Sequence, residues 1–364
     1  MRNLDLDQER QIKKRRRLKK IGLIVGFLVL LSLLGGGFVL WQGDLLTALF
    51  SPISFVARLI NPTKLKETDG RVNALILGLD TRAEGGLLNT DTILVGSFSL
   101  TGGDPALISI PRDLWVSFST GGQGKINSAY AFAAVQQNGK IDEGKGVEAA
   151  KVTVEKVLGI PLHYWVLVDF EGFRQVIDTL GGIEVCVERT FDDYAYPIPG
   201  KEKAPPPQCY EHLHFDKGCQ RMNGDWALKY SRSRMGTAGE GSDFMRVRRQ
   251  QKVILAIKDK ILSLSLLFNP GKVVKLYSQL TKTIKTNASL GETQRALELL
   301  YEFQEITEAK TLVLDPESGL TYVPKNRASY GGAYVILPKG GNFEAIHKTV
   351  QELLFGTKKK AKNR

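Results

Sequence analysis

The feature that most constrains this chain is an uncharged run of twenty residues, IGLIVGFLVLLSLLGGGFVL, at positions 21–40. Twenty residues of α-helix rise about 30 Å, which matches the hydrocarbon thickness of a bilayer. A cleavable signal peptide has a shorter apolar region followed by a small-residue cleavage site, and this run shows neither. Together with Trp41, which suits a membrane interface, the run predicts one transmembrane helix over residues 21–41.

Basic residues set the orientation of this helix. Residues 10–20 contain eight Lys and Arg, and the positive-inside rule therefore places residues 1–20 in the cytoplasm and residues 42–364 outside the cell membrane. The closing KKKAKNR holds five more, and the other 37 of the 50 basic residues nearly balance the 38 acidic ones. A near-neutral body on the outer side, with no helix-turn-helix pattern, disfavours a nucleic-acid partner.

The composition, 43% hydrophobic and 24% charged, is typical of a globular chain. The sequence predicts an ordered series of parts along it. These are a basic cytoplasmic tail (1–20), the transmembrane helix (21–41), an extracytoplasmic stalk (42–70), a compact α/β domain (71–265), an accessory region of helices and strands (266–350) and a basic tail (351–364).

The α/β domain shows strand and helix patterns in turn. VNALILGL is almost continuously apolar and predicts a strand buried on both faces. TILVGSFSL and PALISIP predict two further strands joined by a hairpin turn at TGGD. The spacing of apolar residues predicts a helix over DFEGFRQVIDTLGG that Gly181 ends, and a longer one that begins at Ser242 or Asp243.

Three cysteines predict one disulfide and one free thiol, and leave the pairing among Cys186, Cys209 and Cys219 open. Cys209 and Cys219 are local partners, but the extended YEHLHF between them would hold them apart. Cys186 lies on the more polar face of IEVCVE and could reach either partner. A zinc site that includes His212 and His214 is the alternative, although its spacing matches no standard ligand pattern.

Charged residues stand at strand ends in LGLDTRAEGGLLNTDTILVGSF, residues 77–98: Asp80, Arg82 and Asp91. If TGGD closes a hairpin, paired residue numbers sum to about 205, which brings Asp91 near Arg112 and Asp113. A parallel arrangement beside LISIP would bring Asp80 to the same edge, where open α/β sheets bind ligands. Two carboxylates and several arginines at one edge suit a divalent cation and a phosphate group.

Further polar residues are available in two later stretches. KYSRSRMG supplies Arg232 and Arg234, which lie among apolar neighbours. Arg246 and Gln250 are four residues apart and therefore share one face of the long helix. Arg248 and Arg249 of the same helix are expected to form a solvated surface.

Seven ordered motifs resemble the LytR-CpsA-Psr family of bacterial cell-envelope proteins over about residues 71–260: NALILGLDTR, NTDTILVGSFSL, LISIPRDLWV, GKINSAYAFA, LGIPLHYWVLVDFEGFRQVIDTLGGIEV, GDWALKYSRSR and DFMRVRRQQKVI. The resemblance implies a layered α/β/α sandwich with a central mixed sheet, carried outside the membrane on one N-terminal helix. It also implies a phosphotransferase that moves a glycopolymer from an undecaprenyl-pyrophosphate carrier to peptidoglycan.

The resemblance assigns roles by position. Asp80 and Asp91 match the family's magnesium-binding acids, with Mn²⁺ as an alternative ion, and these two acids with Arg112 are the expected catalytic residues. The pyrophosphate-binding set is Arg82, Arg112, Arg232, Arg234, Arg246 and Gln250. An apolar slot for the lipid is expected between the sheet and the helices of residues 145–180, lined by Trp165, Val168, Phe170, Phe173 and Ile177.

Two other functions remain open at this point. A polyprenyl-pyrophosphate hydrolase would use the same metal and arginines with water as the acceptor. A non-catalytic envelope scaffold would not need two acids and five arginines to converge. The sequence names neither the glycan nor the oligomeric state.

Overall fold

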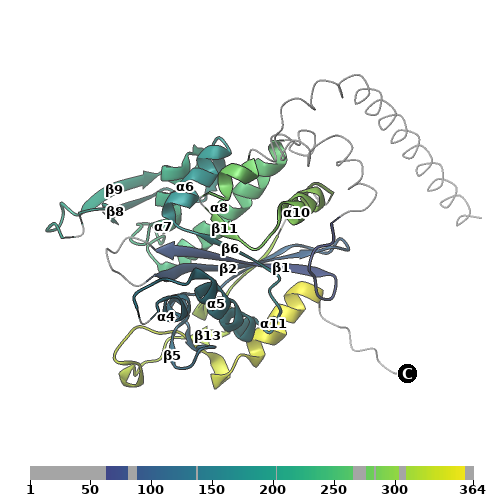
Figure 1. Cartoon of the computed structure of the whole chain (residues 1–364). Helices are drawn as coiled ribbons and strands as arrows, with labels where there is room; N and C mark the ends of the chain where they lie inside the picture. The colour runs from purple at the N-terminus through teal and green to yellow at the C-terminus, as the bar shows by residue number, and fades with distance from the viewer. Residues whose placement is uncertain are drawn as a thin grey trace, which may run out of the picture. The chain divides into compact units, whose positions relative to one another are not determined.

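A six-stranded sheet with the strand order β11-β6-β1-β2-β3-β12 lies at the centre of the protein (Figure 1). This computed structural model describes residues 63–80, 88–136, 138–201, 203–264, 276–282, 284–302 and 309–356. The strands are β1 (Arg71–Asp80), β2 (Asn89–Ser99), β3 (Ala106–Ser109), β6 (Tyr164–Val168), β11 (Ile284–Thr286) and β12 (Lys310–Val313).

The sheet is mixed, as expected. β1 pairs in parallel with β6 and antiparallel with β2, whereas β3 pairs antiparallel with β2 and in parallel with β12. β6, β1, β3 and β12 therefore run in one direction, and their carboxyl ends share one edge. The expectation that β1 lies beside β3 is wrong, because β2 separates them, but both strands do end at the same edge.

Helices cover both faces of the sheet (Figure 1). One layer contains α6 (Phe170–Thr179), α7 (Gly224–Arg232), α8 (Asp243–Ser263) and α10 (Leu290–Glu302). The other contains α4 (Ala129–Ala134), α5 (Glu143–Leu158) and α11 (Glu344–Phe355). Residues 65–364 form one compact unit with this three-layered arrangement.

Short elements complete the described fold. Four two-stranded sheets pair β4 (Trp115–Ser117) with β5 (Gln123–Lys125), β7 (Ile183–Val187) with β10 (Gly218–Met222), β8 (Phe191–Pro197) with β9 (Tyr210–Phe215), and β13 (Thr321–Tyr322) with β14 (Leu337–Pro338). The 3₁₀ helices are η1 (Ile126–Ser128), η3 (Pro316–Ser318), η4 (Ala328–Tyr330) and η5 (Lys339–Gly341).

Side chains of β1 alternate between two environments. Leu75, Leu77 and Leu79 belong to the apolar core under α4, α5 and α11. Ile76 and Gly78 face the other way and line a cavity under α6, α7 and α8. The expectation of a strand buried on both faces is therefore wrong in part, because one face is tightly packed and the other borders empty space.

Each of the two predicted helices begins after a residue whose side chain caps its N-terminus. Asp169 accepts a hydrogen bond from the Gly172 amide at 2.7 Å and begins α6, and Gly181 follows its end with a φ of +79°. Ser242 accepts from the Met245 amide at 3.1 Å and begins α8. The cap of α8 is thus Ser242, one of the two residues that the sequence predicted.

The chain after α8 contributes to both edges of the sheet. β11 pairs with β6, and β12 pairs with β3. α11 places Ile346, Val350 and Leu354 in the same core as α5. The accessory region expected from residue 266 onward therefore packs as part of this α/β unit.

Cys186 and Cys219 form a disulfide between β7 and β10, where the two residues are register partners. Cys209 is a buried free cysteine. His212 and His214 both contact the Asp192 carboxylate, and the described residues contain no group of three or more His, Cys, Asp or Glu side chains that could hold a metal. The alternative of a zinc site therefore has no support in the described structure.

The predicted transmembrane helix over 21–41, the tail before it, most of the stalk and residues 357–364 lie outside the described residues. Among the residues that are described, no helix combines the length and the apolar character needed to cross a bilayer.

Candidate active site

A β-bulge places Asp91 at the carboxyl edge of the sheet. Gly78 of β1 pairs with Thr92 of β2, but Leu79 pairs with Thr90, so Asp91 is an additional residue without a partner in β1. Bulges redirect a side chain and leave one residue outside the hydrogen-bonding ladder. The carbonyl oxygen of Asp91 accepts instead from Arg246 Nη2 at 3.3 Å.

The Asp91 carboxylate has two donors. Arg112, which follows Pro111 after β3, donates from Nη1 to Oδ2, and Asn127 of η1 donates from Nδ2 to Oδ1 at 3.0 Å. This confirms the predicted proximity of Asp91 and Arg112. The observed pairs of β2 and β3 run from Ser97–Ala106 to Leu94–Ser109 and sum to 203, and residues 91 and 112 have the same sum beyond the last pair.

Asp243 joins the arginines of α8 to those of the strand edge. Its Oδ2 accepts from Arg246 Nη2 at 3.0 Å, and its Oδ1 lies 3.2 Å from Arg234 Nε and 3.9 Å from Arg112 Nε. Asp113 lies on the other side of Arg112, 3.6 Å from its Nε, and accepts from Lys125 Nζ at 2.6 Å. One cluster of acids and bases therefore spans β2, β3, β5 and α8.

Burial and the neighbouring carboxylates have opposite effects on the pKa values of Arg112 and Arg246. Burial opposes the charged form of Arg112, but Asp91, Asp243 and Asp113 outweigh it and raise its pKa. Burial lowers the pKa of Arg246 to about 10, although Asp243 partly offsets the effect. Both side chains therefore stay cationic at neutral pH, in a partly desolvated position where charge acts strongly.

Three buried polar atoms at this edge have no hydrogen-bond partner within the described part of the chain: Arg112 Nε, Arg246 Nε and Asn89 Oδ1. Each such atom costs about 1–3 kcal/mol, which a bound ligand would recover. Asn89 is the register partner of Asp80, so the two side chains share one face of the sheet. Hydrogen-bond donors and acceptors without a partner among the described residues therefore lie at the same edge of the sheet.

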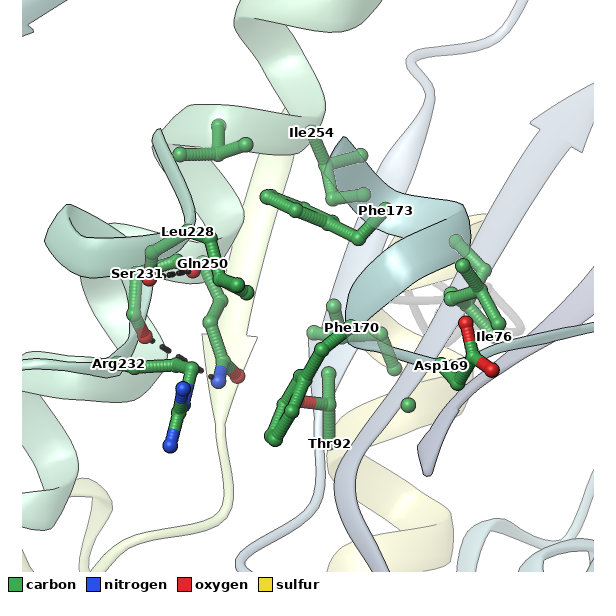
Figure 2. Close-up of a pocket in the computed structure, with 14 residues that line it drawn as sticks. Ile76, Thr92, Asp169, Phe170, Phe173, Leu228, Ser231, Arg232, Gln250 and Ile254 are labelled. Atoms are coloured by element: carbon green, nitrogen blue, oxygen red, sulfur yellow. Dashed lines mark hydrogen bonds between the residues drawn. The ribbon is translucent and has the colours of Figure 1, made fainter. Parts of the chain in front are cut away.

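A cavity of about 540 Å³, including the space at its mouth, opens beside this cluster. Figure 2 shows Phe170 and Phe173 of α6 facing Leu228 of α7 and Ile254 of α8 across the empty space. Gly78 and Thr92 of the sheet lie along its floor. Nearly all of these side chains are apolar, so the cavity suits a hydrocarbon.

Arg232 and Gln250 line the same cavity (Figure 2). The Arg232 guanidinium lies over the Phe170 ring, 4.0 Å from its centroid, and donates from Nη1 to Tyr196 Oη at 3.1 Å. Gln250 donates to the Ser231 carbonyl at 3.5 Å. Arg232 is two residues from Arg234, and Gln250 is one helical turn from Arg246, so the apolar cavity and the charged cluster adjoin.

Not all predicted lipid-pocket residues reach the cavity. Val168, Phe170 and Phe173 line it. Trp165 packs on the core of the opposite face, because its position in β6 has the same parity as Leu167. Ile177 is fully buried in a core of β7–β10, α7 and α8 residues. Arg82 lies outside the described residues.

Arg249 corrects a prediction. It is not a solvated surface residue, because it is 1% exposed. It pairs with Glu240 at 2.6 Å and donates to the carbonyls of Tyr230, at 3.0 Å, and Ser233. These contacts fix the loop between α7 and α8, which carries Arg234. The neighbouring Arg248 is exposed as expected and pairs with Glu317.

Sequence reasoning missed several residues of the cluster. Asn127 and Lys125 lie in GKINSAY, and Asp243 was considered only as a helix cap. Asp113 was placed near Asp91 but given no role. The only signal in the sequence was their position just after or before an apolar element.

These features define a class of protein: an α/β domain whose cluster of arginines and acids adjoins an apolar cavity. The LytR_cpsA_psr family model matches residues 56–338. The chain therefore belongs to the LytR_cpsA_psr family, which confirms the resemblance found in its motifs.

Relatives in the family are moderately similar. The chain is 29% identical over 284 residues to the polyisoprenyl-teichoic acid–peptidoglycan teichoic acid transferase TagV of Bacillus subtilis, a match that covers 77% of this chain and 64% of TagV. It is 30% identical over 298 residues to TagU of Oceanobacillus iheyensis, named as the same kind of transferase, with 79% of this chain and 83% of TagU covered.

Solved structures agree with the fold. The crystal structure of B. subtilis TagV matches with a TM-score of 0.57 and 28% identity, covering 79% of this chain and 98% of that one. TagT bound to LIIa-WTA matches with a TM-score of 0.55 and 26% identity, covering 80% and 94%.

Proposed function

We propose that this protein is a membrane-anchored phosphotransferase that moves a glycopolymer from an undecaprenyl-pyrophosphate carrier onto peptidoglycan. The observation that carries the proposal is the adjacency of an arginine-rich cluster and an apolar cavity. A polyprenyl pyrophosphate has this same combination of a dianionic head and a hydrocarbon tail. The names of TagV and TagU, which are transferases of teichoic acid to peptidoglycan, support the choice of substrates.

Each part of the site has a task in this reaction. Phe170, Phe173 and the floor at Gly78 accept the first units of the tail. Arg232, held by the Phe170 ring and the Tyr196 hydroxyl, binds the phosphate that enters beside the tail. Arg112 and Arg246 bind the pyrophosphate through their guanidinium groups, and charge-assisted bonds of this kind are the strong ones.

In the transfer step, an acceptor hydroxyl oxygen bonds to the phosphorus that carries the glycan. The bond from this phosphorus to the bridging oxygen breaks, and that oxygen leaves with polyprenyl phosphate, whose oxygens can take the proton that the hydroxyl loses. Arg112, Arg234 and Arg246 neutralise the charge that spreads over the phosphate oxygens. Positioning and electrostatics supply the rate in such reactions, and no covalent intermediate is required.

The residues also fit a divalent cation. Mg²⁺ takes oxygen ligands and is held by one or two carboxylates together with phosphate oxygens. Asp80 and Asp91 would hold Mg²⁺, or Mn²⁺, beside the unpartnered oxygen of Asn89. The ion would neutralise phosphate charge when bound.

The proposed anchor is the apolar run at 21–41, with the N-terminus cytoplasmic and the α/β domain outside. A reporter that is active only outside the membrane, fused after Arg364, should be active. A stable but silent fusion, together with activity of a cytoplasmic reporter at the same place, would contradict the orientation.

The activity is tested on the full chain in detergent micelles, with a labelled polyprenyl-pyrophosphate saccharide, Mg²⁺ and peptidoglycan fragments. Label should appear on the peptidoglycan with release of polyprenyl phosphate, and chelation should stop it. Arg112→Lys keeps the charge but loses the fork, so the rate should fall about ten- to a hundredfold. Arg248→Lys is the matched control on an exposed arginine and should be unaffected. Free saccharide phosphate as the only product would indicate a hydrolase instead.

A further inference from the structure

A segment near the C-terminal end of the chain forms a wall of the candidate active site. The Ile336 amide donates to the Asp113 carbonyl at 2.9 Å, and the Trp115 amide donates to the Ile336 carbonyl at 2.9 Å. Leu114 and Ile336 form a parallel bridge. The residues around Ile336 therefore run alongside the three residues that directly follow Arg112.

A tight turn at η4 precedes this segment. The Arg327 carbonyl accepts from the amides of Tyr330, at 2.9 Å, and Gly332, at 3.0 Å. Gly331 and Gly332 have φ values of +62° and +75°, which residues other than glycine rarely adopt. The turn thus reverses the chain between Tyr330 and Tyr334 and holds the Tyr330 ring against Trp115 of β4.

The side chains of the turn form an aromatic cluster. Tyr330 packs edge-on against Trp115 with 5.1 Å between ring centroids. The Arg327 guanidinium lies 5.2 Å over the Tyr334 ring. Tyr334 is 40% exposed, so one large part of its ring remains open to a ligand.

This cluster adjoins the acid–arginine cluster. Burial raises the pKa of Tyr334, and the carboxylates of Asp113 and Asp243 raise it further. The phenol is therefore neutral at physiological pH and can donate a hydrogen bond. The Arg327 guanidinium over the Tyr334 ring adds a positive charge beside the phenol.

The aromatic cluster and the apolar cavity lie on opposite faces of the sheet. Ile336 and Leu114 belong to the core that contains α4 and α5, whereas the cavity is lined by α6, α7 and α8. Figure 1 shows β5 and β13 on the side of α4 and α5. A lipid tail in the cavity would leave the aromatic face open for the second substrate.

The chemistry of the cluster suits a saccharide. Aromatic rings offer flat apolar surfaces to the C–H faces of sugar rings, and phenol, indole and guanidinium groups donate hydrogen bonds to hydroxyl and acetamido oxygens. The positive charges of Arg327 and Lys125 also attract carboxylate groups on an amino-sugar chain to the aromatic cluster.

We propose that Trp115, Arg327, Tyr330 and Tyr334 form the acceptor subsite, which binds an amino-sugar glycan and brings its hydroxyl to the pyrophosphate from the α4–α5 side. The proposal rests on the proposed transferase function and adds the place where the acceptor binds.

The test measures acceptor and donor separately on the full chain in micelles. The probe is a peptidoglycan tetrasaccharide without stem peptides. Tyr334→Ala and Tyr330→Ala should raise the KM for the tetrasaccharide about five- to tenfold, with kcat within about twofold and donor Kd unchanged. Tyr334→Phe keeps the ring but loses the hydroxyl donor, so its KM should lie between those of the wild type and Tyr334→Ala, which separates loss of the ring from misfolding. Tyr210→Ala removes a tyrosine of similar exposure on β9 and should change neither value.

Three results would overturn the assignment: an unchanged acceptor KM, an equal loss for Tyr210→Ala, or a weaker donor Kd with the acceptor KM intact. Direct binding of the tetrasaccharide, followed by NMR without donor, separates this inference from the proposed function. Binding that Tyr334→Ala weakens, in a protein that shows no transfer, would contradict the transferase and leave the saccharide site in place. Absence of binding in a protein that does transfer would contradict the site alone.

Discussion

Asp193 accepts a hydrogen bond from the Ser233 hydroxyl at 2.6 Å, and both residues are buried. The same carboxylate oxygen also accepts from the amides of Arg234 and Met235, each at 3.2 Å. The Asp193 carboxylate of β8 therefore fixes the backbone of the α7–α8 loop, which carries Arg234 of the candidate active site.

Asp193→Asn should destabilise the protein by about 2–4 kcal/mol, because an amide nitrogen would face donors where a carboxylate oxygen now accepts. The displaced Arg234 should also weaken binding of polyprenyl pyrophosphate. Urea unfolding and ligand titration measure the two effects. Asp192→Asn is the control on an exposed neighbour and should cost less. Equal losses for the two variants would contradict a special role for Asp193.

Arg249 and Arg248 are adjacent on α8 and should differ greatly on truncation. Arg249→Ala removes the closer cationic partner of the buried Glu240 carboxylate, which keeps the more exposed Arg189 at 3.4 Å, and should cost about 3–5 kcal/mol. Arg248→Ala removes an exposed pair with Glu317 and should change stability by no more than about 0.5 kcal/mol. Chemical unfolding of both variants provides the comparison. Similar values would mean that the Arg249–Glu240 pair does not hold the α7–α8 loop.

Gly78 has no side chain, and this leaves space at the floor of the cavity. A Cβ atom there would lie 2.8 Å from Thr92 Cβ, so β1 or β2 must shift to accept it. Gly78→Ala should therefore cost about 1–3 kcal/mol and narrow the cavity, which weakens binding of polyprenyl substrates. Gly96→Ala is the matched control in β2, because nothing lies within 4 Å of its added atom. Unchanged lipid affinity in a folded Gly78→Ala protein would place the tail elsewhere.

Two histidines should titrate on opposite sides of the ordinary value. Hydrogen bonds to Asp192 and Asp216 raise the pKa of His214, whereas burial lowers the pKa of His163. The His214 contribution to stability is thus complete below its unfolded-state pKa and lost as pH rises through the higher folded pKa. NMR titration of the imidazole signals checks both directions, and Asp192→Asn should lower the pKa of His214. A His214 that titrates below His163 would contradict the contacts.

Sequence patterns predicted the parts of this protein that depend on local periodicity and on strand order. Hairpin arithmetic brought Asp91 to Arg112 because β2 and β3 are antiparallel neighbours without an irregularity between them. The bulge at Asp91 could not be predicted, because Leu79 and Thr90 show no special residue type. Its effect is to turn Thr90 toward the core, where its hydroxyl donates to the Asn127 carbonyl.

The features that sequence patterns did not predict depend on contacts between residues that are distant in the sequence. Arg249 carries the same charge as Arg248, but the Glu240 carboxylate, the surrounding carbonyls and the Phe191 and Tyr230 rings make its burial favourable. Trp165 was assigned to the lipid slot from its apolar character, although the alternation of β6 turns it to the other face. Cys186 forms its disulfide with Cys219 because the two residues are register partners in β7 and β10, a contact that no spacing rule indicates.

The outer strands of the central sheet have a consequence for the timing of folding. β12 pairs with β3, and Ile336 pairs with the residues after Arg112, so the last quarter of the chain must be present before the sheet and the site are complete. Contacts between such distant parts of a chain form slowly. A nascent chain that has passed α8 already carries every arginine of the phosphate-binding set, yet it still lacks both edge strands of the sheet, β11 and β12, and one wall of the site. Synthesis itself therefore delays activity until the segment around Ile336 has been made.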